Sequence, residues 1–201
     1  MTSERVIHVA SLTSPEVIEF VAVAGRFCDA IDQVEQSAEL DFLRQMQQLL
    51  PLAYSRAQAL EWPWHYEGED DEDEEIVLEP EPDITLPHGG HLEWWAYVRD
   101  VIGKKLSWHR LFHFVYDPVN PNDREVINAD LADCLADIYV DLKIGLLHYA
   151  EGTTEHQSEA IWKWKFEAGA PGWANHVAEV MLPIHHLLHT HYDEDDEVFD
   201  I

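Results

Sequence analysis

Four aspartates recur at spacings of three or four residues in the segment NADLADCLADIYVDLKIGLLHY, residues 128–149. Residues at this spacing are neighbours on an α-helix, so Asp130, Asp133, Asp137 and Asp141 are expected to line one edge of a helix. Like charges at this spacing destabilise a helix, so something is expected to compensate for their repulsion. Carboxylate oxygens suit Mg²⁺, Mn²⁺ or Ca²⁺, which makes Asp133, Asp137 and Asp141 candidate metal ligands. The alternative is an edge that is solvated or paired with basic residues of a neighbouring helix: Arg99, Lys104, Lys105 or Arg124.

The C-terminal histidines are a second candidate metal site. His185 and His189 are four residues apart, so their imidazoles can converge on an ion such as Zn²⁺ or Ni²⁺. The metalloprotease pattern HExxH is absent, because His186 follows His185 where that pattern needs a glutamate. The arrangement therefore predicts adventitious metal uptake, or simply exposed polar histidines. His176 is expected in the core or at its edge. His176 and Asp137 are the candidate catalytic residues of a hydrolase, with His176 as its acid or base.

Three aromatic residues, Trp162, Trp173 and Tyr139, are candidates to line a ligand pocket. Large aromatic side chains at helical spacing more often belong to the core, where each buries about 150–250 Å². Both interpretations stay open at this point. No glycine-rich phosphate loop precedes a helix, and no serine or cysteine stands in a nucleophile motif. No cofactor is therefore expected beyond these metals.

The charge of the chain is strongly acidic, with 40 Asp and Glu against 12 Lys and Arg. Residues 67–83 and 193–201 carry eleven and six of these acids and no base. A surface of this sign repels nucleic-acid phosphate and anionic lipid, so neither is expected as a partner. It favours a basic protein or divalent cations, although solubility alone can account for such a charge.

Only two cysteines are present, Cys28 and Cys134, and both lie among apolar residues in helical patterns. They are expected to be buried and reduced, as in a reducing compartment. The N-terminal residues lack the basic and apolar regions of a signal peptide, and no apolar run reaches the length of about 18 residues that suggests a membrane span. The sequence thus predicts a soluble, cytoplasmic protein.

Helical periodicity dominates the remaining sequence and predicts an all-α fold. Ser14-Pro15-Glu16 is a typical helix start. The expected helices cover residues 14–35, 37–60, 91–114, 128–151, 155–168 and 173–189. Pro51 is expected to kink or split its helix, and Pro183 to kink its own. The prediction is one domain over residues 1–201, a bundle of about six to seven helices. An acidic flexible loop is expected at 65–88 and an acidic tail at 191–201.

Several segments together resemble a bacterial helical family known as domain of unknown function 5063. They are YDP at 116–118, DLADCLADIYVDLKIGL at 130–146, AIWKWKF at 160–166, and Trp173 with His176. Segments like FVAVAGRFCDAI (20–31) and LLPLAYSRA (49–57) also fit, so the resemblance extends over about residues 16–189. It implies an all-α single domain and no particular activity.

Two functions follow as hypotheses. The first is a non-catalytic protein-binding or regulatory module that holds a basic partner on its acidic surface, since no catalytic motif accompanies the charge of −28. The alternative is a divalent-metal-dependent helical hydrolase, similar to nucleotide pyrophosphohydrolases, that uses the aspartates of residues 133–141 with His176 as acid or base. A hydrolase of that kind needs acid pairs on a second helix as well, and neither Glu16/Glu19 nor Glu35/Glu39 follows the expected motif well.

Overall fold

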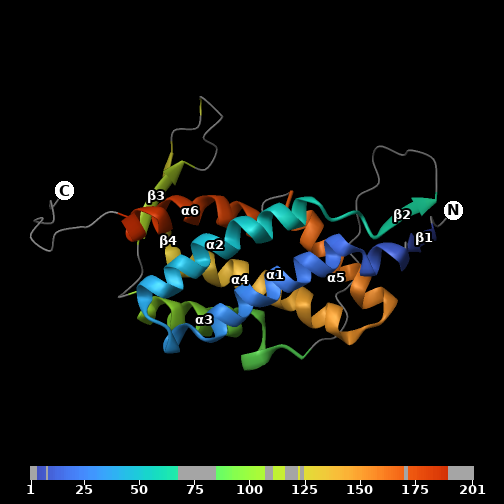
Figure 1. The fold of residues 1–201 in the computed structure, drawn as a ribbon, viewed down its shortest axis with the longest axis horizontal. Coiled ribbons are helices and arrows are strands. Elements are labelled where there is room, and N and C mark those ends of the chain that lie inside the picture. Colours follow the sequence, from blue (N-terminus) through green and yellow to red (C-terminus); the bar gives the residue numbers. More distant parts are fainter. Residues whose placement is uncertain are drawn as a thin grey trace, which may run out of the picture.

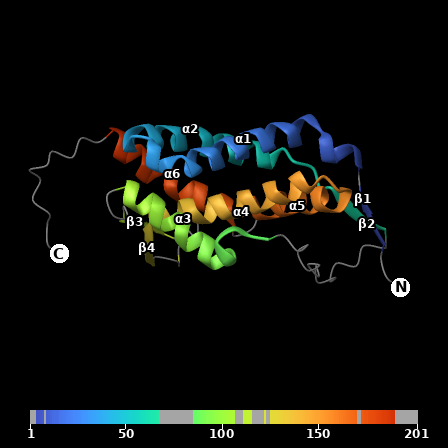
Figure 2. The ribbon, with the colours of Figure 1, turned by 90° about the horizontal axis from the view of Figure 1, so that it is seen from below.

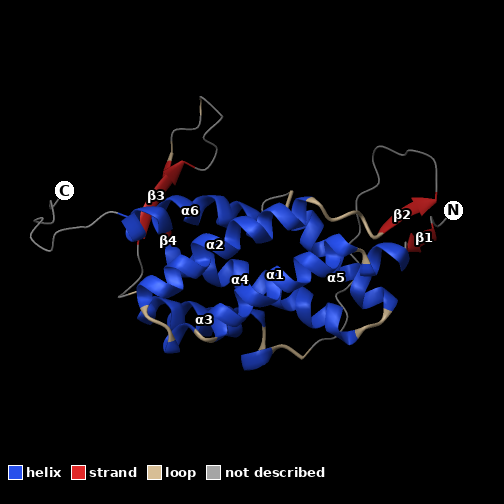
Figure 3. Cartoon of the chain, viewed as in Figure 1, coloured by secondary structure: helices blue, strands red, loops and turns tan. Residues whose placement is uncertain are grey.

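The computed structural model describes residues 4–7, 9–67, 85–106, 111–115, 122, 125–169 and 172–189. This part is predominantly helical, as predicted (Figure 1; Figure 3). Its α-helices are α1 (Pro15–Asp32), α2 (Glu39–Gln58), α3 (His91–Lys105), α4 (Leu131–Glu151), α5 (Thr154–Glu167) and α6 (Trp173–His189). Its strands are β1 (Glu4–Ile7), β2 (Trp64–Glu67), β3 (Leu111–Val115) and β4 (Val126–Asp130). Short 3-10 helices are η1 (Val9–Thr13), η2 (Val34–Gln36) and η3 (Pro87–Gly89).

Helix α4 is the central element of the bundle and contacts α1, α3, α5 and α6. Figure 2 shows α1 and α2 together on one side of the molecule, with α3, α4 and α5 on the other. The helices α1 and α2 run in opposite directions, which is the antiparallel hairpin expected from their short connection (Figure 1). The aspartates of α4 therefore lie on a helix that has neighbours on most of its circumference.

The helix ends follow from local sequence. The Ser14 hydroxyl accepts a hydrogen bond from the Val17 amide at 3.3 Å, and Pro15 occupies the first turn of α1. Gly152 closes α4 with a left-handed φ of 76°, a conformation that glycine adopts without steric cost. Thr153 then caps α5 through the His156 amide at 3.2 Å. These two residues thus turn the chain directly from α4 into α5.

The two proline-containing helices are continuous. Pro51 lies inside α2 and Pro183 inside α6, and each helix spans the proline as one element. Of the two outcomes expected for Pro51, a split of α2 is therefore excluded. Each proline removes one backbone donor, but burial of the apolar stripe on both sides of it outweighs that loss.

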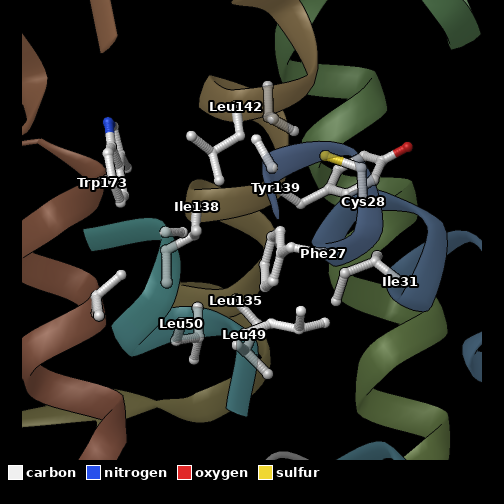
Figure 4. Packing of buried hydrophobic residues seen from close by; sticks show 14 of the residues in the cluster. Phe27, Cys28, Ile31, Leu49, Leu50, Leu135, Ile138, Tyr139, Leu142 and Trp173 are labelled. Carbon is white, nitrogen blue, oxygen red and sulfur yellow. The ribbon is translucent and has the colours of Figure 1, made fainter. Parts of the chain in front are cut away.

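The core is built where α1, α2 and α4 meet. Figure 4 shows Phe27 of α1 close to Leu135 and Ile138 of α4, with Leu49 and Leu50 of α2 beside them. All five side chains are buried. Full burial of each such side chain contributes about 1.5–3 kcal/mol, so this contact holds α4 in its orientation.

The segment 111–115 is a strand, not the continuation of a helix as the sequence predicted. Leu111–Val115 pairs antiparallel with Val126–Asp130, with Leu111 opposite Asp130 and Val115 opposite Val126. Burial alternates along the first part of β3, and its aromatic and branched side chains suit a pleated surface. The predicted start of the fourth helix at residue 128 was also wrong, because β4 continues to Asp130.

The structure describes only the two ends of the segment 65–88, which was predicted as an acidic flexible loop. Trp64–Glu67 forms β2, which pairs with Glu4–Ile7, and Pro87–Gly89 forms a 3-10 turn. Residues 68–84 and the predicted tail at 191–201 lie outside the described residues. Among the helices of the described part, none combines the length and the apolar character that crossing a membrane requires.

Candidate functional site

The first aspartate of the α4 edge has a structural task. Asp130 ends β4 and caps α4, accepting a hydrogen bond from the Ala132 amide at 2.9 Å. The residue is only 8% exposed. A carboxylate at this position satisfies a free amide and interacts favourably with the positive end of the helix dipole. Asp130 thereby fixes the point where the hairpin turns into the central helix.

Arg99 of α3 neutralises the first half of the aspartate edge. Its Nε forms an ion pair with Asp133 Oδ1, and its Nη2 lies 3.8 Å from Asp130 Oδ2. This is the basic neighbour that the sequence offered as the alternative to a metal. Of the other basic candidates, Lys104 pairs with Asp100 and Lys105 with backbone carbonyls of residues 35 and 37, while Arg124 lies outside the described residues.

The second half of the aspartate edge lies near basic side chains of two other helices, His176 of α6 and Lys163 of α5. Asp137 Oδ2 lies 3.7 Å from His176 Nε2 on α6. Burial raises the pKa of Asp137, and the neighbouring His176 opposes this rise. Burial also raises the pKa of Asp141, and here Lys163 of α5 is the main opposing charge. The edge is thus divided among three helices, and the proposed Mg²⁺ or Mn²⁺ ligation by Asp133, Asp137 and Asp141 stays a prediction.

A compact cluster joins α4 and α6 beside Asp137. The His176 Nδ1 lies 3.0 Å from Glu179 Oε2, and the Cys134 thiol donates to the same oxygen at 3.9 Å. The three ligand-type atoms lie within 4.8 Å of one another. The hydrogen bond to Glu179 raises the pKa of His176, although burial opposes it. Burial, reinforced by the charge of Glu179, raises the pKa of Cys134 to about 12.

A groove of about 660 Å³ lies next to this cluster, between β3 and α6. Its strand side presents Phe112 and Phe114, whose ring centroids are 6.0 Å apart. Its helix side includes Leu182, which is 63% exposed, and Glu179, which also belongs to the cluster. The remaining described lining residues are His113, Val115, Asn175, Ala178, Pro183 and His186.

The three predicted ligand-binding aromatics are not brought together. Trp173 is fully buried in the core, 6.2 Å from Phe20. Trp162 stacks on Phe166 with centroids 4.9 Å apart. Tyr139 donates to Asp32 Oδ1 at 2.6 Å and lines a separate cavity of about 280 Å³ between α3 and α4. The two tryptophans line neither of these two cavities, whereas Tyr139 borders the smaller one.

The predicted histidine pair does converge. His185 and His189 lie on the exposed side of α6 with ring centroids 4.6 Å apart. Asp193 and Glu194, the first acidic residues after this pair in the sequence, lie outside the described residues. Zn²⁺ or Ni²⁺ uptake at this pair stays a prediction.

Sequence reasoning missed Cys134 and Glu179 as functional candidates. Glu179 follows His176 by three residues on α6, a spacing that places both on one helix face, and this signal was available. Cys134 lies far away in the sequence, and its position next to them depends on the packing of α4 against α6. The groove was missed because β3 was assigned to a helix.

The chain belongs to the family described as a domain of unknown function, DUF5063, whose model matches residues 11–190. The crystal structure of protein BF1032 from Bacteroides fragilis is similar in fold, with a TM-score of 0.67. That similarity covers 90% of this chain and 96% of the other at 20% sequence identity. No curated protein matches the chain.

Proposed function

Because membership of this family assigns no activity, we propose from the geometry that the protein is a non-catalytic protein-binding module. Its binding site is the groove between β3 and α6, and its partner is a basic protein segment that carries a large apolar side chain. The observation that carries the proposal is the groove of about 660 Å³ with aromatic rings on one wall and an exposed leucine on the other.

Apolar surface in the groove supports an apolar anchor on the partner. Leu182 is 63% exposed, and Phe112 and Phe114 are partly exposed on the opposite wall. An occupant that covered these side chains would remove apolar area from water, at about 25 cal/mol per Å². Anchors of this kind dominate the binding energy of protein interfaces.

Charge supports a basic partner. The whole chain carries a net charge of −28, and Glu179 contributes a carboxylate to the groove wall. Glu179 Oε2 lies 3.0 Å from His176 Nδ1, and the described lining residues of the groove include no lysine or arginine. A negative surface attracts a positively charged segment during the diffusional encounter and disfavours acidic competitors.

A binding role also fits the pairing of the aspartate edge. Asp133 is held by Arg99, and Asp137 faces His176, so these carboxylates already have partners within the fold. We place the module in the cytoplasm as part of the proposal. The buried free thiols of Cys28 and Cys134 suit a reducing compartment.

The proposal is tested with labelled synthetic peptides of equal length that share a central leucine and phenylalanine, flanked by lysines, serines or glutamates. Fluorescence polarisation is expected to rank the affinities in that order, with the lysine peptide weakened by added salt. Leu182→Glu should weaken binding about tenfold or more, because a buried leucine contributes about 1.5–3 kcal/mol and 1.4 kcal/mol is a factor of ten.

Leu92→Glu is the matched control, because Leu92 is a similarly exposed leucine (69%) on α3 and does not line the groove. It should leave binding unchanged. Equal affinity for the three peptides, no binding of any of them, or equal behaviour of the two variants would contradict the proposal.

A divalent-metal-dependent hydrolase, similar to nucleotide pyrophosphohydrolases, is the second candidate. It is favoured by the half-buried carboxylates of Asp137 and Asp141, one of which faces His176. Calorimetric titration with Mg²⁺ and with Mn²⁺ tests it directly. Binding heat that disappears in Asp137→Asn would support this function, whereas the absence of heat in the unaltered protein would remove it.

A further inference from the structure

We propose that Cys134, His176 and Glu179 form a binding site for a transition metal ion of the Zn²⁺ class between α4 and α6. Thiolate, imidazole and carboxylate are the three side-chain groups that bind Zn²⁺ in proteins. Here one ligand atom of each kind lies within 4.8 Å of the other two. This inference is independent of the groove's proposed partner, and its experiment uses no peptide.

Two of the three distances between the donor atoms are close to those of a tetrahedral zinc site. With Zn–S of about 2.3 Å and Zn–N and Zn–O of about 2.1 Å, tetrahedral angles place S and O about 3.6 Å apart and N and O about 3.4 Å apart. The thiol sulfur lies 3.9 Å from Glu179 Oε2, and His176 Nδ1 lies 3.0 Å from it. These two distances therefore differ by about 0.3–0.4 Å from those of a tetrahedral site, and all three donor atoms lie within 4.8 Å of one another.

A second carboxylate holds the far side of the imidazole. Asp137 Oδ2 lies 3.7 Å from His176 Nε2, while Nδ1 faces Glu179 and the thiol. Metal-binding histidines commonly donate their other N–H to a carboxylate, which orients the ring and makes it a better ligand. Asp137 is thus a positioning residue for the site and not one of its three ligands.

The charge around the thiol favours a dication. Burial raises the pKa of Cys134, and the charges of Glu179, Asp137 and Asp133 raise it further, because a thiolate there would stand among carboxylates. A bound dication supplies the missing positive charge, and the thiol proton and any proton on Nδ1 are released to solvent on binding. No electron transfer is involved in this exchange of protons for a metal ion.

The three side chains leave a fourth coordination position. Glu179 lines the groove as well as belonging to the cluster, so a metal at this site borders the groove wall. Water can complete the coordination there. The exposed pair His185 and His189 is a competing place for the same ions and has to be removed from the measurement.

The test uses the full chain with His185, His189 and His191 replaced by glutamine, titrated with Co²⁺ under reducing conditions. We expect a sulfur-to-cobalt charge-transfer absorption and the intense visible bands of tetrahedral Co²⁺, which Zn²⁺ then displaces. Cys134→Ser should abolish the charge-transfer band. Cys28→Ser, which alters a buried thiol outside the cluster, should keep it.

Two further variants keep the test decisive if Cys134→Ser proves unstable. Glu179→Gln conserves size and should weaken Zn²⁺ binding at least tenfold. Asp137→Asn should leave the band in place and weaken affinity by about 10–100-fold, the range found for groups that orient a ligand. Zn²⁺ should raise the unfolding midpoint of the histidine-replaced parent but not of Glu179→Gln.

The proposal is overturned by any of three results. The parent protein could show no thiolate band with Co²⁺, the band could survive Cys134→Ser, or it could disappear in Cys28→Ser. Failure of this test would leave the peptide-binding proposal intact, since no peptide measurement depends on the metal.

Discussion

Replacing Gly145 by alanine is expected to destabilise the protein, although the same change usually stabilises a helix interior. Gly145 lies in α4 against the indole of Trp164 from α5, the residue that packs on Phe20 with ring centroids 4.9 Å apart. An added Cβ would lie 2.5 Å from Trp164 Cε2 and 2.9 Å from Cζ2. Ordinary carbon contacts are about 3.5–4.0 Å, so the indole would have to move by about 1 Å.

The size of the effect follows from two opposing contributions. Trp164 is fully buried, so it cannot move without displacing its neighbours, and overpacking of this kind costs about 1–3 kcal/mol. Alanine gains about 1 kcal/mol over glycine in helix propensity. We take the upper end of the first range, because the overlap involves backbone-bound Cβ and a rigid ring, and expect a net loss of about 2 kcal/mol.

Gly25→Ala is the matched control. Gly25 lies in the interior of α1, and a Cβ added there meets nothing within 4 Å. This change should stabilise the protein by about 0.5–1 kcal/mol. Urea unfolding followed by circular dichroism measures both variants, and an unchanged m-value confirms that only stability has changed.

A double-mutant cycle with Trp164→Phe identifies the contact as the cause. The smaller ring leaves space for the new methyl group, so Gly145→Ala should cost much less in the Trp164→Phe background than alone. If Gly145→Ala is as stable as the unaltered protein, or if its cost is the same with either ring, the argument from close packing is wrong.

Three further changes test the α4 edge and its surroundings. Asp130→Ala should lower the free energy of unfolding in urea by about 1 kcal/mol, because the cap of α4 is lost. Asparagine can also cap a helix, so Asp130→Asn should keep most of that free energy. Because burial raises the pKa of Asp141, the folded state binds this proton more tightly than the unfolded chain. The contribution of protonated Asp141 to stability is therefore fully present below its unfolded pKa of about 3.9, and it is lost as the pH rises through the folded pKa. Asparagine does not titrate. In urea titrations, the stability of Asp141→Asn relative to the unaltered protein should therefore increase from acidic to neutral pH. Tyr139→Phe should cost about 1–2 kcal/mol in thermal or urea unfolding by removing the 2.6 Å hydrogen bond to Asp32, and an unchanged stability would show that water replaces it fully.

Most of the helical fold was predictable because its signals are local. The start of α1 depends on Ser14, Pro15 and Glu16, which are adjacent in the sequence. The helix expected over residues 155–168 is also present as α5. The edge of α4 was likewise predictable, since 3.6 residues per turn bring every third or fourth residue to one side.

The strands were not predictable in the same way. The pattern of residues 111–115 fits both the helical and the strand periodicity. Whether this segment forms a strand depends on its backbone pairing with residues 126–130. Short strands gain stability mainly from their partners, so the sequence of one strand carries little information about its state. The groove that β3 forms with α6 depended on that pairing and could not be foreseen.

The sequence by itself determined which residues share a helix face, because the geometry of one helix is set by bonds between near neighbours. It placed Asp133, Asp137 and Asp141 on one edge of α4, and it placed His176 and Glu179 on one face of α6. Only the tertiary structure decided that the first of these carboxylates meets Arg99, that the second meets His176, and that Cys134 joins His176 and Glu179. Those meetings depend on how α4 packs against α3 and α6, and that packing is decided by the burial of apolar side chains on all these helices together.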